Sequence, residues 1–454
     1  MKSISLQYVR EQIRNTHPRT RKAHLNTIWG LGVKGGGMLI SLLLVPITID
    51  YLSKETYGTW LTISSIVTML SFLDIGIGNG LRNKFSEAVT KDDKILARAY
   101  VSTSYLIFGL IQLGLILLFL IFFQFVPWQK IFNTHIKTEP LQLVIMTTFV
   151  AMAIKLVLDI LTYVLLALQE SGRVGFINLL SNILILTGTY TLSKLTHGNL
   201  IYLAIITVSS PIIVLLISGY FLYKNQLKAY KPSLSLVRIK HARSLLSLGY
   251  KFFFIQISVI VLFYTDNLII TQLFGPSEVT TYNVAFRYFN AASTLFAIAI
   301  TPYWSAFTEA AVRFDTSWMQ KSHRYLQKLW IGLAAIVVLM VIAADYVYSL
   351  WVGDRVMVPM ELNICMGVFI LVSSWNSIIA AVVNGLGKVQ LQLYYALFSA
   401  VINIPLAILL GKKLNMGASG VILATSLSLL FCSLIGGLQV RKLMSGTAKG
   451  IWDK

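Results

Sequence analysis

Four basic residues lie inside long apolar stretches of this chain, and their side chains could do chemistry there: Lys34, Lys155, Lys251 and Arg287. A charge at the centre of a bilayer costs at least ~2.5–3.5 kcal/mol on insertion scales, so it usually faces a partner, a cavity or a transport pathway. Two cations at one cavity would bind a diphosphate strongly, because opposite charges attract more where water is scarce. The residue types therefore indicate anion binding.

Three acidic residues also lie in apolar stretches: Asp74, Asp159 and Asp266. Lys155 and Asp159 are four residues apart, so they share one helix face and can form an ion pair. Matching distance from the nearest connecting loop suggests two further pairs: Lys34 with Asp74, and Asp266 with Arg287. Two interpretations stay open. The residues are neutralised pairs that dock helices, or they face a cavity, with Asp159 or Asp266 exchanging a coupling proton or sodium ion.

Lys251 has no acidic residue at matching depth, and an internal repeat relates it to Lys34. The segment Leu31-Gly32-Val33-Lys34 corresponds to Leu248-Gly249-Tyr250-Lys251, 217 residues later. We predict that Lys34 and Lys251 face each other near the cytoplasmic mouth of a central cavity, with Arg287 nearer the outer side. The alternative for Lys251 is that its ammonium group reaches the cytoplasmic membrane surface along its aliphatic stem.

Membrane-spanning helices must position these residues. Hydrophobic residues make up 56% of the chain and charged residues 12%, whereas soluble proteins carry about 25% charged residues. Apolar stretches of 18 residues or more, long enough to span, recur along the chain. We predict an all-α polytopic membrane protein with twelve transmembrane helices, near residues 24–50, 57–80, 96–126, 141–168, 173–193, 199–223, 244–274, 280–308, 325–345, 361–384, 389–411 and 417–440.

The distribution of basic residues predicts the orientation. With the N-terminus inside, 27 of the 38 lysines and arginines fall in inner segments and 7 in outer loops, so both termini should be cytoplasmic. The first 25 residues lack the hydrophobic core of a signal peptide, so we expect no cleaved one. We ascribe the net charge of +20 to topology and contact with anionic lipids. No segment outside the membrane is long enough for a nucleic-acid-binding domain.

The repeat also predicts the domain organisation. We expect an N-terminal lobe over residues 1–223, a basic cytoplasmic linker over 224–243 and a C-terminal lobe over 244–454. Six helices in each lobe would give both the same topology, related by a pseudo-two-fold axis along the membrane normal. Substrate in such transporters usually sits near the midplane between the halves.

Two stretches carry a family resemblance. The first is Tyr57-Gly58-Thr59-Trp60 followed by Asp74-Ile75-Gly76-Ile77-Gly78-Asn79-Gly80. The second is Thr265-Asp266-Asn267-Leu268-Ile269-Ile270-Thr271-Gln272-Leu273-Phe274-Gly275, followed by Tyr282-Asn283-Val284-Ala285. Both resemble bacterial O-antigen and exopolysaccharide flippases of the multidrug/oligosaccharidyl-lipid/polysaccharide exporter superfamily.

This resemblance implies a MATE-like alternating-access protein of the bacterial inner membrane, with two six-helix lobes and a central cavity. It implies that the cargo is an undecaprenyl-diphosphate-linked oligosaccharide, moved from the cytoplasmic to the outer leaflet for O-antigen or other surface polysaccharide biosynthesis. Membrane lipids, the polymerase and the chain-length machinery of the same pathway are the implied partners. The residues themselves, independently of the resemblance, lead us to predict that Lys34, Lys251 and Arg287 bind the substrate. Asp74, Lys155, Asp159 and Asp266 are predicted to couple ions or to form structural pairs.

Other activities have less support in the sequence. No GxxxxGK[ST] motif occurs, and neither the six histidines nor Cys365 and Cys432 show metal-ligand spacing. We therefore expect no catalytic residue, no metal and no cofactor beyond a coupling ion, and we expect both cysteines to be buried. The alternative function is a MATE-type cation or drug antiporter. The lysine in the first span argues against that alternative, since many multidrug relatives carry an acid there.

Overall fold

The computed structural model describes residues 18–71, 77–168, 170–238, 240, 258 and 260–453, and within these ranges the regular secondary structure is entirely helical. The longer helices are α2 (Pro18–Tyr51), α3 (Lys54–Ser71), α4 (Ile77–Thr90), α5 (Lys94–Phe123), α7 (Thr138–Leu158), α8 (Ile160–Ala167), α9 (Ser171–Leu195), α10 (Leu200–Lys224), α13 (Asp266–Phe274), α14 (Pro276–Val312), α15 (Thr316–Trp351), α16 (Met360–Gly385), α17 (Gln390–Ile408) and α18 (Gly417–Met444). The short ones are α6 (Trp128–Ile131), η1 (Lys228–Tyr230), η2 (Leu234–Leu236), η3 (Gly353–Arg355), η4 (Leu409–Lys413) and η5 (Gly450–Asp453).

Ten spans in the described residues are long and apolar enough to cross a membrane, with α7 and α8 forming one of them and α17 and η4 another. They match ten of the twelve predicted helices. The other two predictions, near 57–80 and 244–274, include residues 72–76 and 244–257, which lie outside the described residues. The all-helical membrane fold is confirmed, while the count of twelve stays a prediction.

Local sequence signals set several helix ends. Asp93 caps α5 by accepting a hydrogen bond from the backbone N–H of Leu96, and Asn199 caps α10 in the same way. Side-chain oxygens at this position satisfy backbone donors that the first helical turn leaves free. Between α13 and α14, Gly275 takes a φ of 90° and Pro276 begins the next helix, so the two helices join by a sharp turn.

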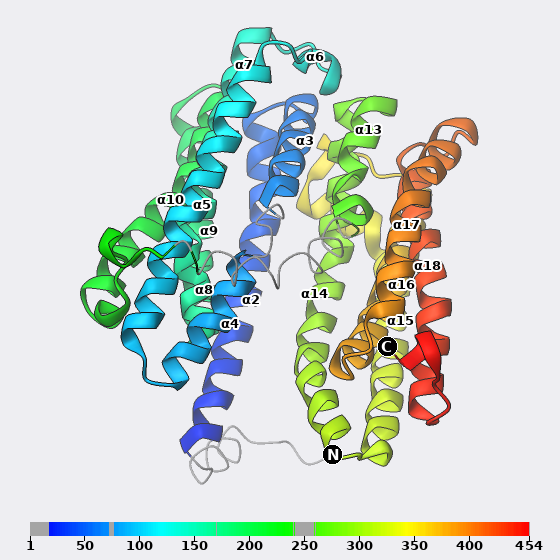
Figure 1. The fold of residues 1–454 in the computed structure, drawn as a ribbon. Coiled ribbons are helices and arrows are strands. Elements are labelled where there is room, and N and C mark those ends of the chain that lie inside the picture. The colour runs from blue at the N-terminus through cyan, green and yellow to red at the C-terminus, as the bar shows by residue number, and fades with distance from the viewer. Residues whose placement is uncertain are drawn as a thin grey trace, which may run out of the picture.

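The helices form two bundles that lie side by side (Figure 1). We call α2–α10 the N-terminal bundle and α13–α18 the C-terminal bundle. The basic segment 224–243 connects the two bundles. Its described part packs on the N-terminal bundle, where Arg98 Nε donates to the carbonyl of Lys231 at 2.6 Å. The predicted lobe boundaries and the pseudo-two-fold axis stay predictions.

The bundles are joined at the end of the molecule that contains Tyr51 and Gly275, which we call the closed end. The Oγ1 atoms of Thr62 and Thr271 lie 2.6 Å apart, and Thr280 Oγ1 donates to the carbonyl of Lys54 at 2.6 Å. Arg355 forms an ion pair with Asp50 across the same boundary. These contacts bring α3 against α13 and α14.

Toward the opposite end, which contains Pro18 and Val312, α2 and α14 diverge (Figure 1). We call this the open end. Between residues 32–40 of α2 and residues 288–301 of α14, whose side chains the structure describes, no hydrogen bond forms. A cavity lies between the two helices instead.

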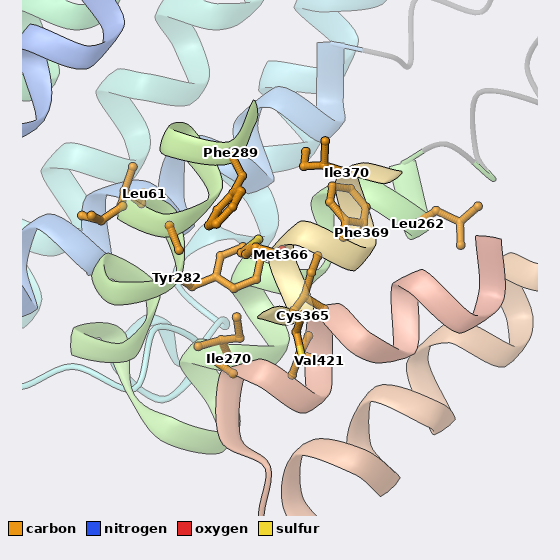
Figure 2. Close-up of a cluster of buried hydrophobic side chains, with 14 of the residues drawn as sticks. Leu61, Leu262, Ile270, Tyr282, Phe289, Cys365, Met366, Phe369, Ile370 and Val421 are labelled. Atoms are coloured by element: carbon orange, nitrogen blue, oxygen red, sulfur yellow. The ribbon is translucent and has the colours of Figure 1, made fainter. Parts of the chain in front are cut away.

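The apolar core of the C-terminal bundle reaches into the N-terminal bundle through α3. Figure 2 shows part of this cluster, drawn from α3, α14, α16, α18 and the chain around α13: Leu61, Leu262, Ile270, Tyr282, Phe289, Cys365, Met366, Phe369, Ile370 and Val421. Cys365 and Cys432 are both buried, as predicted. Large apolar side chains on the outward faces of the long helices are exposed, as expected where lipid is the solvent: Leu110, Ile121, Leu216, Leu339 and Ile342.

Candidate functional site

A central cavity of about 500 Å³ lies between α2 and α14. Helix α2 contributes Lys34, Met38 and Ser41, which follow one another on successive turns of one face. Helix α14 contributes Arg287 and a polar row that follows it on the same face: Asn290, Ser293 and Thr294. The charged side chains among the described lining residues, Lys34 and Arg287, are both basic.

Lys34 is exposed at this cavity. Among the described residues it forms no ion pair and no side-chain hydrogen bond. Its predicted acidic partner, Asp74, and its predicted counterpart across the cavity, Lys251, lie outside the described residues. The ammonium group of Lys34 is therefore placed where it can meet a solute between the bundles.

Arg287 links the two bundles through neutral oxygens. Its Nη1 atom donates to the carbonyl of Ser41 at 2.8 Å and to Ser41 Oγ at 2.7 Å. A guanidinium group has five N–H donors, so this contact uses only part of its capacity. Ser41 is seven residues after Lys34, which places the Arg287 contact about 10 Å further along the α2 axis.

Two smaller cavities continue from Arg287 into the N-terminal bundle. The first, of about 270 Å³, shares Ser41 and Arg287 with the central cavity and is also lined by Asn182. The second, of about 250 Å³, shares Trp60 with the first and reaches Lys155. Polar positions therefore run from the central cavity to the interior of the N-terminal bundle.

Lys155 and Asp159 form the predicted ion pair, with 2.5 Å between Lys155 Nζ and Asp159 Oδ2. The pair lies at the one-residue break between α7 and α8. Both side chains are mostly buried, with 30% and 20% exposed. The carboxylate neutralises the ammonium group, so Lys155 presents little field to a ligand in the neighbouring cavity.

Asp266 has polar partners of a different kind from the one predicted. Tyr282 Oη donates to Asp266 Oδ2 at 2.8 Å, and Thr425 Oγ1 lies 3.4 Å from both carboxylate oxygens. Asn403 Nδ2 donates to Thr425 Oγ1 at 3.0 Å. The Asn403 Oδ1 atom is buried, and it has no hydrogen-bond partner among the described residues.

The predicted Asp266–Arg287 pair is therefore wrong. Both residues lie at similar distances from the α13–α14 turn, but their side chains point in opposite directions: Asp266 toward α18 inside the C-terminal bundle and Arg287 toward α2 in the other bundle. Depth along a helix hairpin does not determine the face on which a side chain lies.

More than half of the chain matches a known protein family. A family model described as "Polysaccharide biosynthesis protein" matches residues 24–308, more than half of the chain. The chain belongs to the polysaccharide biosynthesis protein family.

The chain is also similar to a Salmonella typhi protein named "Putative O-antigen transporter". The two sequences are 24% identical over 350 residues, which cover 75% of this chain and 76% of the relative. The two findings confirm the resemblance to polysaccharide transporters seen in the sequence.

Solved structures with the same fold are MATE-type transporters. An inward-facing multidrug resistance MATE family transporter of the MOP superfamily matches with a TM-score of 0.74 at 16% identity, covering 93% of this chain and 98% of that chain. An outward-facing structure described in the same words matches with a TM-score of 0.63 at 16% identity, covering 94% and 95%. A Pyrococcus furiosus MOP superfamily transporter, described by a reverse polarity of its binding pocket, matches with a TM-score of 0.64 at 14% identity, covering 94% and 95%. The MATE-like fold is thus confirmed for this polysaccharide biosynthesis family member, a transmembrane helical transporter.

Sequence reasoning missed several residues of the site. Ser41 lies two helical turns after Lys34, so its spacing could have singled it out as sharing the face of Lys34. No sequence signal marked Asn403 or Thr425 as neighbours of Asp266, because they come from α17 and α18, more than 130 residues away.

Proposed function

We propose that this transporter moves an undecaprenyl-diphosphate-linked oligosaccharide from the cytoplasmic to the outer leaflet of the bacterial inner membrane, for O-antigen or other surface polysaccharide biosynthesis. The observation that carries the proposal is that the described charged residues lining the central cavity, Lys34 and Arg287, are basic. Ammonium and guanidinium groups form strong, charge-assisted hydrogen bonds with phosphate oxygens. Family membership supports the class of cargo.

The open end would face the cytoplasm, which the positive-inside distribution of basic residues supports. In this arrangement Lys34 lies nearer the mouth and Arg287 lies deeper, so a diphosphate entering from the cytoplasm would meet them in that order. Lys251 would add a third cation to the mouth. The polar row on α14 and Asn182 on α9 would offer hydrogen bonds to sugar hydroxyls.

Arg287 would also link binding to the change of access. Its hydrogen bonds to Ser41 join the bundles at the depth of the cavity. A phosphate that takes over donors of the guanidinium group would weaken this link, because the phosphate is charged and Ser41 is neutral. The bundles could then rearrange so that the closed end separates and releases the cargo outside.

Ion coupling would use Asp266 rather than Asp159. Asp159 is neutralised by Lys155, whereas no basic residue is described as a partner of Asp266. The Asp266 carboxylate contacts the hydroxyl groups of Tyr282 and Thr425, and Thr425 in turn contacts Asn403, whose Oδ1 atom is buried without a described partner. Oxygen ligands of this kind suit a hard cation such as sodium, and the carboxylate itself could instead carry a proton. The cation would be a co-substrate of transport.

A cation or drug antiporter is the second candidate, since the matching solved structures include multidrug transporters. Such a cargo would be attracted by acidic side chains. The described residues that line the central cavity include no acid, so the cavity favours an anionic cargo.

The test is export in a strain that lacks its own copy of the gene. We expect Lys34→Ala and Arg287→Ala each to reduce surface polysaccharide roughly tenfold or more and to leave lipid-linked oligosaccharide on the inner leaflet, because each removes charge-assisted bonds of roughly 1.5–3 kcal/mol. Lys34→Arg keeps the charge and should retain most export. Lys194→Ala is the matched control, since Lys194 lies over the ring of Tyr190 outside the cavities.

Normal export by both alanine variants, at normal protein levels, would contradict the proposed cargo. Normal surface polysaccharide in the deletion strain, together with new sensitivity to cationic drugs, would favour the antiporter instead.

A further inference from the structure

A second polar pocket, separate from the central cavity, lies at the open end of the C-terminal bundle. It has a volume of about 460 Å³ and is formed where α15, α16 and α18 meet. No lining residue is shared with the central cavity. Gln320 Nε2 donates to the carbonyl of Met444 at 3.0 Å, a hydrogen bond between two lining residues that holds α15 against α18.

Two arginines from different helices line this pocket. Arg324 on α15 and Arg441 on α18 both line it and are exposed. Neither forms an ion pair with a described carboxylate. His323 lines the same region, and its Nδ1 atom is buried without a hydrogen-bond partner in the described part of the chain.

Two basic residues of the same region, Lys442 and Lys388, have partners elsewhere. Lys442, next to Arg441, lies 4.0 Å from the ring centre of Trp452. Lys388 is paired with Asp453 at 2.9 Å. Arg324 Nε donates to the carbonyl of Gln320 at 3.5 Å within its own helix. Its terminal N–H groups and the guanidinium group of Arg441 stay available at the pocket, where a planar guanidinium group can bind phosphate with two N–H groups.

The α16 wall of the pocket is apolar. Trp375 and Ile379 line it from positions nearly three and nearly two turns before the end of that helix at Gly385. On α18, Val440 and Met444 line the pocket on either side of Arg441. The pocket therefore combines two basic side chains, one from α15 and one from α18, with an apolar wall on α16.

We infer that this pocket binds the phosphate headgroup of an anionic phospholipid, with the start of its acyl chains against Trp375 and Ile379. The phosphate would bridge Arg324 and Arg441 and so add to the Gln320–Met444 hydrogen bond that joins α15 to α18. Basic pockets between transmembrane helices on the cytoplasmic side are suited to anionic lipid headgroups. A soluble phosphate would contact the two arginines only and leave the apolar wall on α16 uncovered. The lipid binds outside the cargo cavity, so this inference does not depend on the identity of the cargo.

The experiment measures lipid retention by the purified, detergent-solubilised full chain, using native mass spectrometry after addition of phosphatidylglycerol, cardiolipin or phosphatidylcholine. We expect the wild-type protein to retain the two anionic lipids in preference to phosphatidylcholine. Arg324→Gln/Arg441→Gln should weaken retention roughly tenfold or more, since two charge-assisted contacts are lost. Lys321→Gln/Lys442→Gln is the matched control, because it removes the same charge from residues that do not line the pocket, and it should retain lipid as the wild type does.

Arg324→Lys/Arg441→Lys keeps the charge and serves if the glutamine variant does not fold; it should retain anionic lipid at reduced strength. Equal loss of lipid in the lysine control would overturn the inference, as would undiminished retention by the glutamine variant. Displacement of the lipid by millimolar inorganic phosphate alone, with equal thermal stabilisation, would show that the site recognises a soluble anion and would also overturn it.

Discussion

At the scale of single residues, the partner and not the residue type decides what an intramembrane cation does. Lys155 is neutralised by Asp159, Arg287 is bound to the neutral oxygens of Ser41, and Lys34 is exposed at the cavity. Only a cation without a carboxylate partner keeps its full field for a ligand. Lys34 and Arg287 are therefore better candidates for substrate binding than Lys155.

Asp266 gives a prediction at the same scale. We expect Asp266→Asn to remove any stabilisation of the purified protein by sodium, since a cation that binds the folded state raises stability by mass action. The measurement is the melting temperature in sodium chloride and in choline chloride at several pH values. Asp345→Asn, which changes an exposed acid on α15, is the control.

A sodium-dependent rise in the wild type that persists in Asp266→Asn would contradict the proposed site. A rise on lowering the pH, lost in the variant and independent of sodium, would instead identify a proton as the coupling ion.

At the scale of helices, the joint between the bundles depends on close approach of backbones. Gly58 on α3 lies against the turn between α13 and α14, and a Cβ atom added there would lie 1.7 Å from the carbonyl oxygen of Pro276. Such a distance is impossible, so glycine is required for α3 to reach this turn. The hydrogen bonds of Thr62 and Thr280 depend on the same approach.

We therefore predict that Gly58→Val destabilises the protein by about 1–3 kcal/mol, as overpacking does. The decrease should appear in thermal unfolding of the purified protein and in reduced export. Gly109→Val on α5 is the matched control, since a Cβ atom added at Gly109 would meet nothing within 4 Å. Equal stability of both variants would show that α3 can shift without loss.

At the scale of the whole molecule, the bundles are joined at one end and separated by the central cavity toward the other. Alternating access requires the contacts at the closed end to break while contacts form at the open end. Most described inter-bundle hydrogen bonds lie near the closed end, including that between Thr62 and Thr271. The state seen here is therefore accessible from the open end.

A disulfide across the closed end should arrest transport. The Oγ1 atoms of Thr62 and Thr271 are 2.6 Å apart, so cysteines at these positions can approach disulfide geometry. We expect Thr62→Cys/Thr271→Cys to cross-link on oxidation, to lose export, and to recover it on reduction. Each single cysteine variant is the control, and full export by the fully cross-linked protein would show that this end need not open.

The sequence alone was sufficient to predict that this is a membrane protein, to locate ten of its spans, to recognise its family and to pair Lys155 with Asp159. Span length and apolar content act locally, so they can be recognised in any window of the chain. Lys155 and Asp159 could be paired because four residues on one helix fix their relation. The basic residues could be selected because charge is rare in apolar segments.

Only the tertiary structure decided which groups meet across helices. Ser41 becomes the partner of Arg287, and Tyr282 and Thr425 become the partners of Asp266, because of the rotation of each helix about its axis. The rotation of each helix is set by the packing of its faces against helices that are far away in the sequence. A local sequence pattern therefore cannot predict it. The sequence determined which helices carry charge, while packing determined whether each charge faces a partner, a cavity or the opposite bundle.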